Sequence, residues 1–288
     1  MYPAEFDYYR PKSLAEATAL LRKHKESRVL AGGHSLLPAM RFRLATPKVL
    51  VDIGGIGALA GIKAKGKALE IGALATHTAV ASSSLISRTC PILAETAAQI
   101  GDLQVRNRGT IGGSVAHADP AADYPTVLLA LSATLTAAGQ SGKREIPADK
   151  FFVDLFTTAL KRGEILTSVR MRGYGAGTGG AYVKHRHPAS SYAVVGVAAI
   201  VEVDGGKCER VVLTVGGATA APVRAVAAEK AFTGARTDHA AIAAAAVKVR
   251  ESISNPLSDH YASGDFRVHL ASVMARRALE TAVARANG

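Results

Sequence analysis

The sequence contains no tryptophan, and aromatic residues make up only 5% of its 288 positions. Alanine, valine, leucine and isoleucine must therefore fill the core, since apolar residues amount to 48%. Only two cysteines occur, Cys90 and Cys208, far apart and outside any C-x-x-C pattern. This chain alone is therefore not expected to hold zinc or an iron–sulfur cluster. Buried free thiols in a reducing compartment are the expected state of both cysteines.

Long hydrophobic runs are absent as well. The N-terminal sequence MYPAEFDYYRPKS has no apolar segment of the kind that forms the centre of a secretory signal. No stretch reaches the roughly 18 uninterrupted apolar residues of a membrane-spanning helix, and the longest ones, such as YAVVGVAAIV, are typical of buried strands. We therefore expect a cytoplasmic protein without a transmembrane segment.

Acidic residues are few, 23 against 35 lysines and arginines, which leaves a formal net charge of +12. A charge of this sign raises nucleic acid as a partner. The basic residues are nevertheless scattered in short groups, at 105–108, 184–187 and 275–277, and no aromatic residues alternate with them to stack on bases. The charge is more typical of a solvated surface, or of a docking face for acidic partners, than of a nucleic-acid-binding protein.

The N-terminal half alternates helices, strands and glycine turns. Ser13 and Glu16 form a capping box that begins a helix extending to about residue 25. Strands are expected at 28–32 and 48–53, which makes a small α/β unit of residues 1–55. Residues 56–175 contain strand-like runs at 67–76, 133–139 and 164–171, and helices that begin at Pro91 and at Asp123 or Tyr124.

The sequence pattern changes at Gly173, where the glycine-rich run GYGAGTGG (173–180) interrupts the alternation of strand-like and helical segments. Three strand-like runs follow, at 180–186, 192–203 and 208–215, and Asp204-Gly205-Gly206 between the last two is typical of a hairpin turn. Ala-rich helical segments at 223–232, 239–253 and 265–286 complete the chain. Residues 176–288 are therefore expected to form a small antiparallel sheet of three strands with a helical cover.

GYGAGTGG also contains a formal G-x-G-x-x-G, at Gly175, Gly177 and Gly180. A dinucleotide-binding fingerprint must follow a strand and open a helix, so that the pyrophosphate sits on the helix N-terminus. The segment that follows here, AYVKHRHP, is strand-like. We therefore interpret the glycines as a linker between domains rather than as a nucleotide-binding loop.

Two other glycine loops carry a stronger signal. In VLAGGHSLLP, Gly32 and Gly33 permit close approach of a ligand, and His34 and Ser35 add backbone N–H groups and a hydroxyl. In RGTIGGS, Thr110 and Ser114 bracket Gly112 and Gly113 in the same way. Two such N–H nests facing each other would cradle a pyrophosphate without a lysine, which predicts an anionic cofactor.

Single residues near these loops leave alternatives open. His34 has the chemistry of a base or a metal ligand, but no second ligand lies at a suitable spacing, which favours a role for its backbone. Asp119 and Asp123 suggest catalytic carboxylates, or a helix cap at one of them and a hydrogen-bond acceptor at the other. No Ser/His/Asp or Cys/His triad can be identified from spacing.

Several segments together resemble one family, the FAD-binding medium subunits of the molybdenum hydroxylases. They are FDYYRPKSLAEATALL, LAGGHSLLPAMRFRLATPKVLVDI, EIGALATHT, QVRNRGTIGGSVAHADPAADYPTVLLAL and GEILTSV. Carbon monoxide dehydrogenase medium subunits are the nearer likeness and the flavin domain of xanthine dehydrogenase the more distant one. The resemblance implies an α+β protein: a vanillyl-alcohol-oxidase-type FAD-binding fold in residues 1–175, with subdomains at about 1–55 and 56–175. A C-terminal domain of a three-stranded antiparallel sheet with helices would follow in residues 176–288.

The resemblance also implies non-covalently bound FAD and its contacts, with no catalytic or metal-ligating residue in this chain. The implied cofactor-binding residues are Val29, Leu30, Ala31, Gly32, Gly33, His34, Ser35, Leu36, Ile100, Thr110, Ile111, Gly112, Gly113, Ser114, Asp123, Leu166, Lys184 and Tyr192. Two positions depart from the family pattern. Many relatives have asparagine where Ser114 stands, and tyrosine or phenylalanine is frequent where Asn107 stands.

The role implied by the resemblance is an electron relay. A large subunit with a molybdopterin cofactor would oxidise the substrate, a small subunit with two [2Fe–2S] clusters would pass electrons on, and FAD in this chain would deliver them to an external acceptor. The assembly would be a dimer of heterotrimers in the cytoplasm. Any association of this chain with the inner face of the membrane would be made through the complex. The alternatives are a self-sufficient flavin oxidase of the vanillyl-alcohol-oxidase type and a scaffold that has lost FAD.

Overall fold

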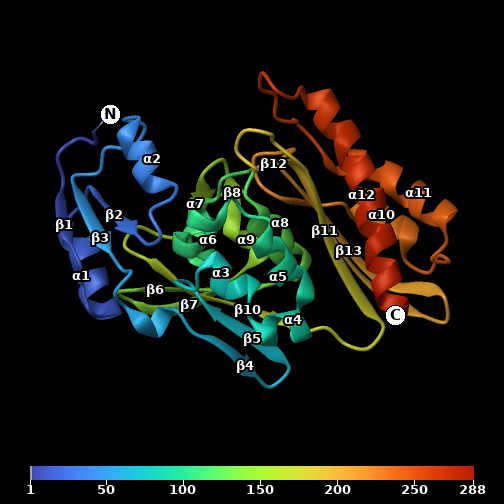
Figure 1. Ribbon diagram of the computed structural model, residues 1–288, viewed down its shortest axis with the longest axis horizontal. Helices are drawn as coiled ribbons and strands as arrows, with labels where there is room; N and C mark the ends of the chain where they lie inside the picture. Colours follow the sequence, from blue (N-terminus) through green and yellow to red (C-terminus); the bar gives the residue numbers. More distant parts are fainter. Residues whose placement is uncertain (1) are drawn as a thin grey trace.

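The computed structural model describes residues 2–288, which form three structural units (Figure 1). The first unit contains a parallel sheet in the order β1-β3-β2. Its elements are β1 (Asp7–Tyr9), α1 (Leu14–Lys23), β2 (Ser27–Leu30), α2 (Leu36–Arg41) and β3 (Val49–Asp52). The predicted cap at Ser13 is confirmed, because its side chain accepts a hydrogen bond from the Glu16 N–H. Leu21 and Val51 meet in the core of this unit.

The second unit is a five-stranded antiparallel sheet in the order β4-β5-β10-β6-β7. Helices cover one face of this sheet (Figure 1). The strands are β4 (Ile62–Lys65), β5 (Ala68–Gly72), β6 (Thr134–Gly139), β7 (Gly142–Pro147) and β10 (Ile165–Arg172). The other elements are η1 (Gly57–Leu59), α3 (His77–Ala81), α4 (Ser84–Thr89), α5 (Pro91–Ala98), α6 (Leu103–Arg108), α7 (Ile111–His117), α8 (Asp123–Ala130), α9 (Ala148–Phe151), β8 (Phe152–Asp154) and β9 (Thr157–Thr158).

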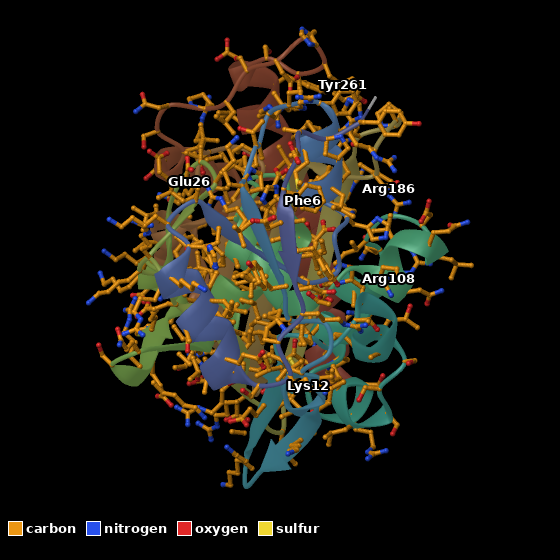
Figure 2. All side chains as sticks on the ribbon, turned by 90° about the vertical axis from the view of Figure 1, so that its left-hand side faces the viewer. Phe6, Lys12, Glu26, Arg108, Arg186 and Tyr261 are labelled. Carbon is orange, nitrogen blue, oxygen red and sulfur yellow. The ribbon has the colours of Figure 1, made fainter. Side chains whose placement is uncertain are left out.

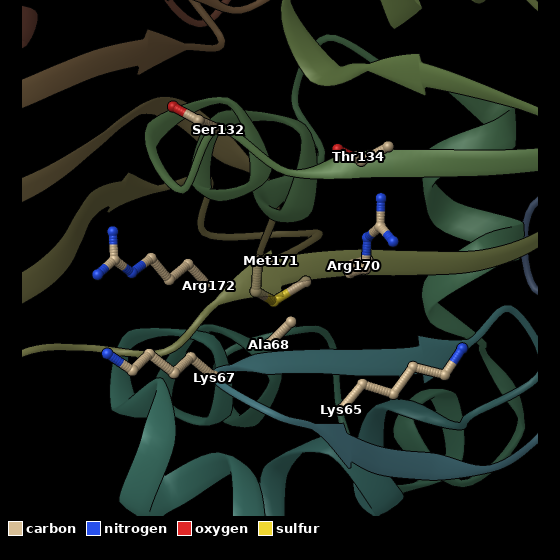
Figure 3. A pocket seen from close by; sticks show the side chains of 8 residues that line it. All are labelled: Lys65, Lys67, Ala68, Ser132, Thr134, Arg170, Met171 and Arg172. Carbon is tan, nitrogen blue, oxygen red and sulfur yellow. The ribbon is translucent and has the colours of Figure 1, made fainter.

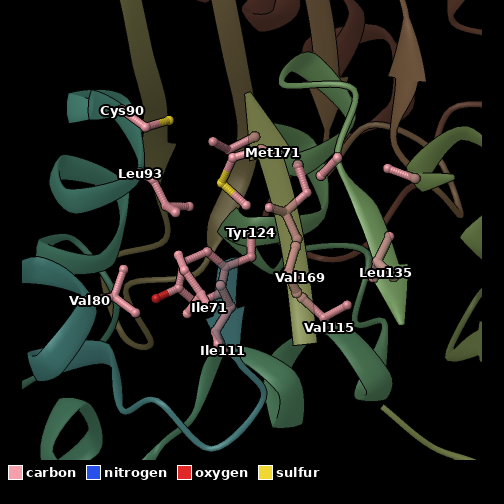
Figure 4. Close-up of a cluster of buried hydrophobic side chains, with 14 of the residues drawn as sticks. Ile71, Val80, Cys90, Leu93, Ile111, Val115, Tyr124, Leu135, Val169 and Met171 are labelled. Carbon is pink, nitrogen blue, oxygen red and sulfur yellow. The ribbon is translucent and has the colours of Figure 1, made fainter. Parts of the chain in front are cut away.

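The core of this unit lies between the sheet and its helices (Figure 4). Val169 on β10 is paired with Ile71 on β5 and with Leu135 on β6, so the three side chains share one face. Tyr124 of α8 is fully buried against them. Cys90 and Cys208 are buried free thiols, as predicted, and burial raises the pKa of Cys90 to about 12.

The third unit corrects the sequence prediction, because its antiparallel sheet has four strands rather than three. Residues 223–232 were predicted to be one helix, but Val223 and Arg224 first pair with β13. Val223 is β-branched and suits a strand, and it pairs with Val215 of β13. The elements are β11 (Thr178–Arg186), β12 (Ala193–Asp204), β13 (Lys207–Gly216), β14 (Val223–Arg224), α10 (Val226–Phe232), α11 (His239–Val247), η2 (Lys248–Ser252) and α12 (Gly264–Asn287).

Two glycine segments border the strands of this unit. Gly205 and Gly206 both have positive φ, +54° and +75°, and join β12 to β13 as the predicted tight hairpin turn. The segment between Arg172 and Thr178 connects the five-stranded sheet to the four-stranded one. A strand and not a helix follows it, so it lacks the geometry of a dinucleotide-binding loop.

The third unit packs directly on the second. The Thr214 hydroxyl on β13 donates a hydrogen bond to the Thr126 carbonyl of α8 at 2.8 Å. Gly216 on β13 lies so close to the Thr126 hydroxyl that no side chain fits there. Arg285 of α12 forms an ion pair with Glu95 of α5 at 2.8 Å. Within residues 2–288, no helix has the length and hydrophobicity needed to cross a membrane.

Candidate functional site

The two glycine loops identified in the sequence are in contact. Loop 1, residues 29–36, runs from the last residues of β2 to the start of α2, and loop 2, residues 108–114, runs from the end of α6 into the first turn of α7. A β-carbon on Gly32 would lie 2.8 Å from the Gly109 α-carbon and closer still to the Arg108 carbonyl oxygen. Gly33 has φ +80°, a conformation that side chains disfavour. Glycine is therefore required in loop 1 partly because the backbone of loop 2 occupies the adjacent space.

Loop 1 presents free hydrogen-bond donors. Among residues 2–288, the backbone N–H groups of Gly32, Gly33, His34 and Ser35 have no acceptor within the protein. His34 is exposed and the other three are partly exposed. Successive N–H groups of this kind form a concave site for an anion. The backbone of loop 1 thus fits the nest predicted from the sequence.

Loop 2 differs from the sequence prediction. The N–H groups of Ile111, Gly112 and Gly113 already donate to Ala73 and Ala75 carbonyls and to the Thr110 hydroxyl, at 2.8–3.0 Å. A β-carbon on Gly112 would lie 2.6 Å from the Ala73 carbonyl oxygen. Gly112 therefore permits α7 to pack on the end of β5, and the expected space for a diphosphate at this residue is not there. Loop 2 has instead the hydroxyls of Thr110 and Ser114, with Ser114 partly exposed.

His77 lies behind loop 2 and was missed by the sequence analysis. Its backbone N–H donates to the Gly109 carbonyl at 2.9 Å, and its Nδ1 is 3.2 Å from the Tyr124 hydroxyl. The side chain is only 4% exposed. Burial lowers the pKa of His77 to about 4, with smaller effects from His34 and Arg106. A lone histidine after a strand gives no spacing signal, so only its buried contacts identify it.

Asp123 and Lys184 lie together, and both were implied to contact the cofactor. Lys184 Nζ is 2.8 Å from Asp123 Oδ2 and also donates to the Gln99 and Ser191 carbonyls at 3.2 and 2.9 Å. The Tyr182 hydroxyl donates to Asp123 Oδ1 at 2.6 Å. Burial raises the pKa of Asp123 and lowers that of Lys184, and their mutual attraction opposes both shifts. The pair joins α8 to β11 across the second and third units.

Asp119 and Asp123 have different roles in the backbone. Asp119 Oδ1 accepts a hydrogen bond from the Ala121 N–H at 2.9 Å, which stabilises the turn before α8. The N-cap of α8 is Ala122, so neither aspartate caps this helix through its side chain. Among residues 2–288 there is also no cluster of three His, Cys, Asp or Glu side chains that could hold a metal ion.

The remaining implied residues are distributed around the loops and the core. Tyr192 is 40% exposed; burial and the Asp119 charge raise its pKa, while the nearby Ser35 hydroxyl of loop 1 lowers it. The Ile100 carbonyl accepts a hydrogen bond from Arg106 Nη1 at 3.0 Å. Leu166 is 4% exposed and packs inside the core of the second unit. Tyr192 is thus next to loop 1, whereas Leu166 belongs to β10.

Exposed cations accompany the loops. Arg108 at the start of loop 2 and Arg186 at the end of β11 are both exposed. Figure 2 shows them on the same side of the molecule. The backbone of Arg108 lies beside Gly32 of loop 1, so a positive residue adjoins the free N–H groups, which favours an anionic ligand.

A separate basic hollow of about 320 Å³ lies elsewhere on the second unit (Figure 3). Lys65 and Arg172 both pair with Ala68 at the N-terminal end of β5, so they flank this small residue on one face. Loop 2 packs on Ala73, beyond the other end of β5. Two cations of the hollow are already in ion pairs, Lys65 with Glu70 and Arg170 with Glu145. The loops instead have free backbone N–H groups, which are fixed donors, so we place the candidate cofactor site there.

The geometry of the loops fits the diphosphate of a dinucleotide such as FAD. Loop 1 supplies four consecutive N–H donors, Thr110 and Ser114 supply hydroxyls, and Arg108 supplies positive charge. Loop 1 belongs to the first unit and loop 2 to the second, so the site is assembled from segments that are far apart in the sequence. Such a site binds and orients an anion.

Comparisons with known proteins cover almost the whole chain. Residues 4–171 match the model of the FAD binding domain in molybdopterin dehydrogenase, and residues 180–282 match the CO dehydrogenase flavoprotein C-terminal domain. The carbon monoxide dehydrogenase medium chain of Afipia carboxidovorans is 40% identical over 99% of both chains. The 6-hydroxypseudooxynicotine dehydrogenase complex subunit alpha of Paenarthrobacter nicotinovorans is 38% identical over 99% of this chain and 97% of its own. In the solved structures, a chain of carbon monoxide dehydrogenase from Hydrogenophaga pseudoflava superimposes with a TM-score of 0.96 at 38% identity over 99% of both chains.

Proposed function

Because this chain belongs to the FAD-binding medium subunits of the molybdenum hydroxylases, the family of the carbon monoxide dehydrogenase medium chain, we propose that it relays electrons. It is an oxidoreductase flavoprotein subunit. In the proposal, one FAD is held non-covalently at loops 1 and 2. Electrons arrive from the [2Fe–2S] clusters of a partner subunit and leave to an external acceptor.

The free N–H groups of loop 1, pressed against loop 2, are the observation that supports this proposal most directly. These four successive N–H groups have no acceptor within residues 2–288, and they lie on three partly exposed residues and on exposed His34, so they are available to an anion. In the proposed fold, of the vanillyl-alcohol-oxidase type, residues 1–175 bind FAD and residues 176–288 form the domain that adds Tyr192 beside loop 1.

The residues of this chain bind and orient rather than react. When bound, FAD supplies redox chemistry in one- or two-electron steps. Loop 1 holds the diphosphate, Thr110 and Ser114 contribute hydroxyls, and Lys184 fixes the position of the segment that carries Tyr192 through the Ser191 carbonyl. Asp123 accepts a hydrogen bond from Tyr182 and forms an ion pair with Lys184. Its role in the proposal is therefore to hold β11 in position beside the site. No proton transfer from this chain is required.

Purified protein is expected to contain one FAD per chain, bound non-covalently. The reason is that the donors of loop 1 make reversible hydrogen bonds to an anion, and nothing in the proposal requires a covalent link. The measurement is the flavin absorbance of the supernatant and of the pellet after acid precipitation. Colour that stays in the pellet, or protein purified from flavin-sufficient cells without flavin, would contradict the proposal.

The partners proposed are an iron–sulfur small subunit and a molybdopterin large subunit, in a dimer of heterotrimers in the cytoplasm, with membrane contact only through the complex. The names of the relatives support this, since they are a medium chain and a complex subunit. The solved relative is described as lacking the Mo-pyranopterin moiety of a molybdenum cofactor. The net charge of +12 suits docking to acidic partners.

Native purification is therefore expected to recover this chain with iron and molybdenum, whereas the chain expressed alone is expected to bind FAD and oxidise no substrate. The lone chain has a cofactor site and, among residues 2–288, no metal cluster of its own. The test is metal analysis of the natively purified complex and a turnover assay of the isolated chain. Substrate turnover by the metal-free chain would favour a self-sufficient flavin oxidase instead.

A further inference from the structure

His77 occupies the point where both loops meet the core. Its Nε2 atom lies 2.6 Å from where a β-carbon on Gly109 would be. The α-carbon of Gly109 in turn lies 2.8 Å from where a β-carbon on Gly32 would be. Gly32, Gly109 and the His77 ring therefore form a contiguous stack without intervening side chains. The ring also lies close enough to His34 of loop 1 for their charges to interact.

The hydrogen bond with Tyr124 fixes which ring nitrogen of His77 carries the proton. The Tyr124 hydroxyl is fully buried, and His77 Nδ1 is its one hydrogen-bond partner among residues 2–288. A buried hydroxyl without an acceptor is costly. Tyr124 therefore donates to Nδ1, which must be unprotonated, and the neutral ring carries its hydrogen on Nε2.

Nε2 is then a donor without a protein acceptor. No residue within 2–288 accepts a hydrogen bond from it. Nε2 of His24 is an unpaired polar atom that solvent cannot reach, whereas Nε2 of His77 keeps some accessible surface. The residue as a whole is nevertheless only 4% exposed. A side chain that is almost fully buried thus keeps one free donor at the contact between loops 1 and 2.

We propose that His77 binds the cofactor, with its neutral Nε2–H donating a hydrogen bond to an oxygen of the FAD diphosphate between the two loops. This inference rests on the proposed function and adds a residue to it that the family resemblance does not name. The donor compensates for loop 2, whose N–H groups at Ile111, Gly112 and Gly113 are already used within the protein. The low pKa of His77 is consistent with a ring that stays neutral near neutral pH.

The test compares two substitutions in the full chain, stripped of flavin and titrated with FAD. His77→Phe fills the ring volume but has no donor, and we expect the dissociation constant for FAD to rise about 10- to 100-fold. His77→Gln is the matched control, because its side-chain amide can place an N–H near the position of Nε2. We expect His77→Gln to stay within about threefold of the wild-type affinity, since it retains the donor.

A spectroscopic measurement gives a readout independent of affinity. In protein labelled with ¹⁵N-histidine, His77 should show the Nε2–H tautomer, and its Nε2 resonance should shift when FAD is added. An unchanged resonance, or equal FAD affinity of His77→Phe and wild type, would overturn the role of His77 and leave FAD binding intact. A wild-type chain that binds no FAD would instead overturn the proposed function itself. Should His77→Phe fail to fold, the resonance of the wild type still decides the question.

Discussion

Gly32→Ala is expected to abolish FAD binding, with a loss of affinity of at least about 100-fold. The added β-carbon would lie 2.8 Å from the Gly109 α-carbon and closer to the Arg108 carbonyl oxygen. Both are backbone atoms, so the clash cannot be relieved by a change of side-chain rotamer. Loop 1 must move away from loop 2, which separates the four free N–H groups from Thr110 and Ser114. The measurement is the flavin-to-protein ratio after purification, followed by a titration with FAD.

Gly57→Ala is the matched control for this experiment. A β-carbon on Gly57 would have no neighbour within 4 Å, and this glycine does not adopt positive φ. The control is expected to bind FAD like the wild type and to unfold at the same temperature. Wild-type flavin content in Gly32→Ala would show that the contact between the loops is not needed for the cofactor.

Lys184→Met is expected to lower the free energy of unfolding by about 3–5 kcal/mol, the usual cost of leaving a buried charge without its partner. Lys184 and Asp123 are only 2% and 5% exposed. Without Lys184, burial acts on the carboxyl with less opposition, so the folded-state pKa of Asp123 lies further above its unfolded value. Stability of the variant is then retained at low pH and lost as pH rises through that pKa. Denaturant unfolding at several pH values measures both effects.

Two further variants make this result specific. Lys184→Met with Asp123→Asn removes both charges, while the asparagine oxygen can still accept from Tyr182, and most of the lost stability should return. Arg210→Met breaks the exposed pair with Glu202, whose side chains are 57% and 41% exposed. Exposed pairs contribute about 0–1 kcal/mol, so this control should change little. A loss in Lys184→Met no larger than in Arg210→Met would contradict a structural role for the buried pair.

Sequence reasoning predicted the features that depend on neighbouring residues. The Ser13 cap, the glycine turn between β12 and β13 and the buried thiols are all present. Sequence reasoning also selected the two glycine loops, which the structure brings into contact. The physical role of individual glycines was less accessible. Gly112 was expected to leave room for a ligand, but it serves the packing of α7 against Ala73.

The sequence by itself determined the short elements, the loops rich in glycine and the family, because each depends on residues within a few positions or on a pattern along the chain. Only the tertiary structure decided which polar groups meet. Tyr124 and His77 are 47 positions apart, and Lys184 and Asp123 are 61 apart. The short strand β14 likewise exists because Val223 and Arg224 find β13 as a partner. Such contacts follow from the order of strands in the sheets and the packing of helices on them, and local propensity carries no information about either.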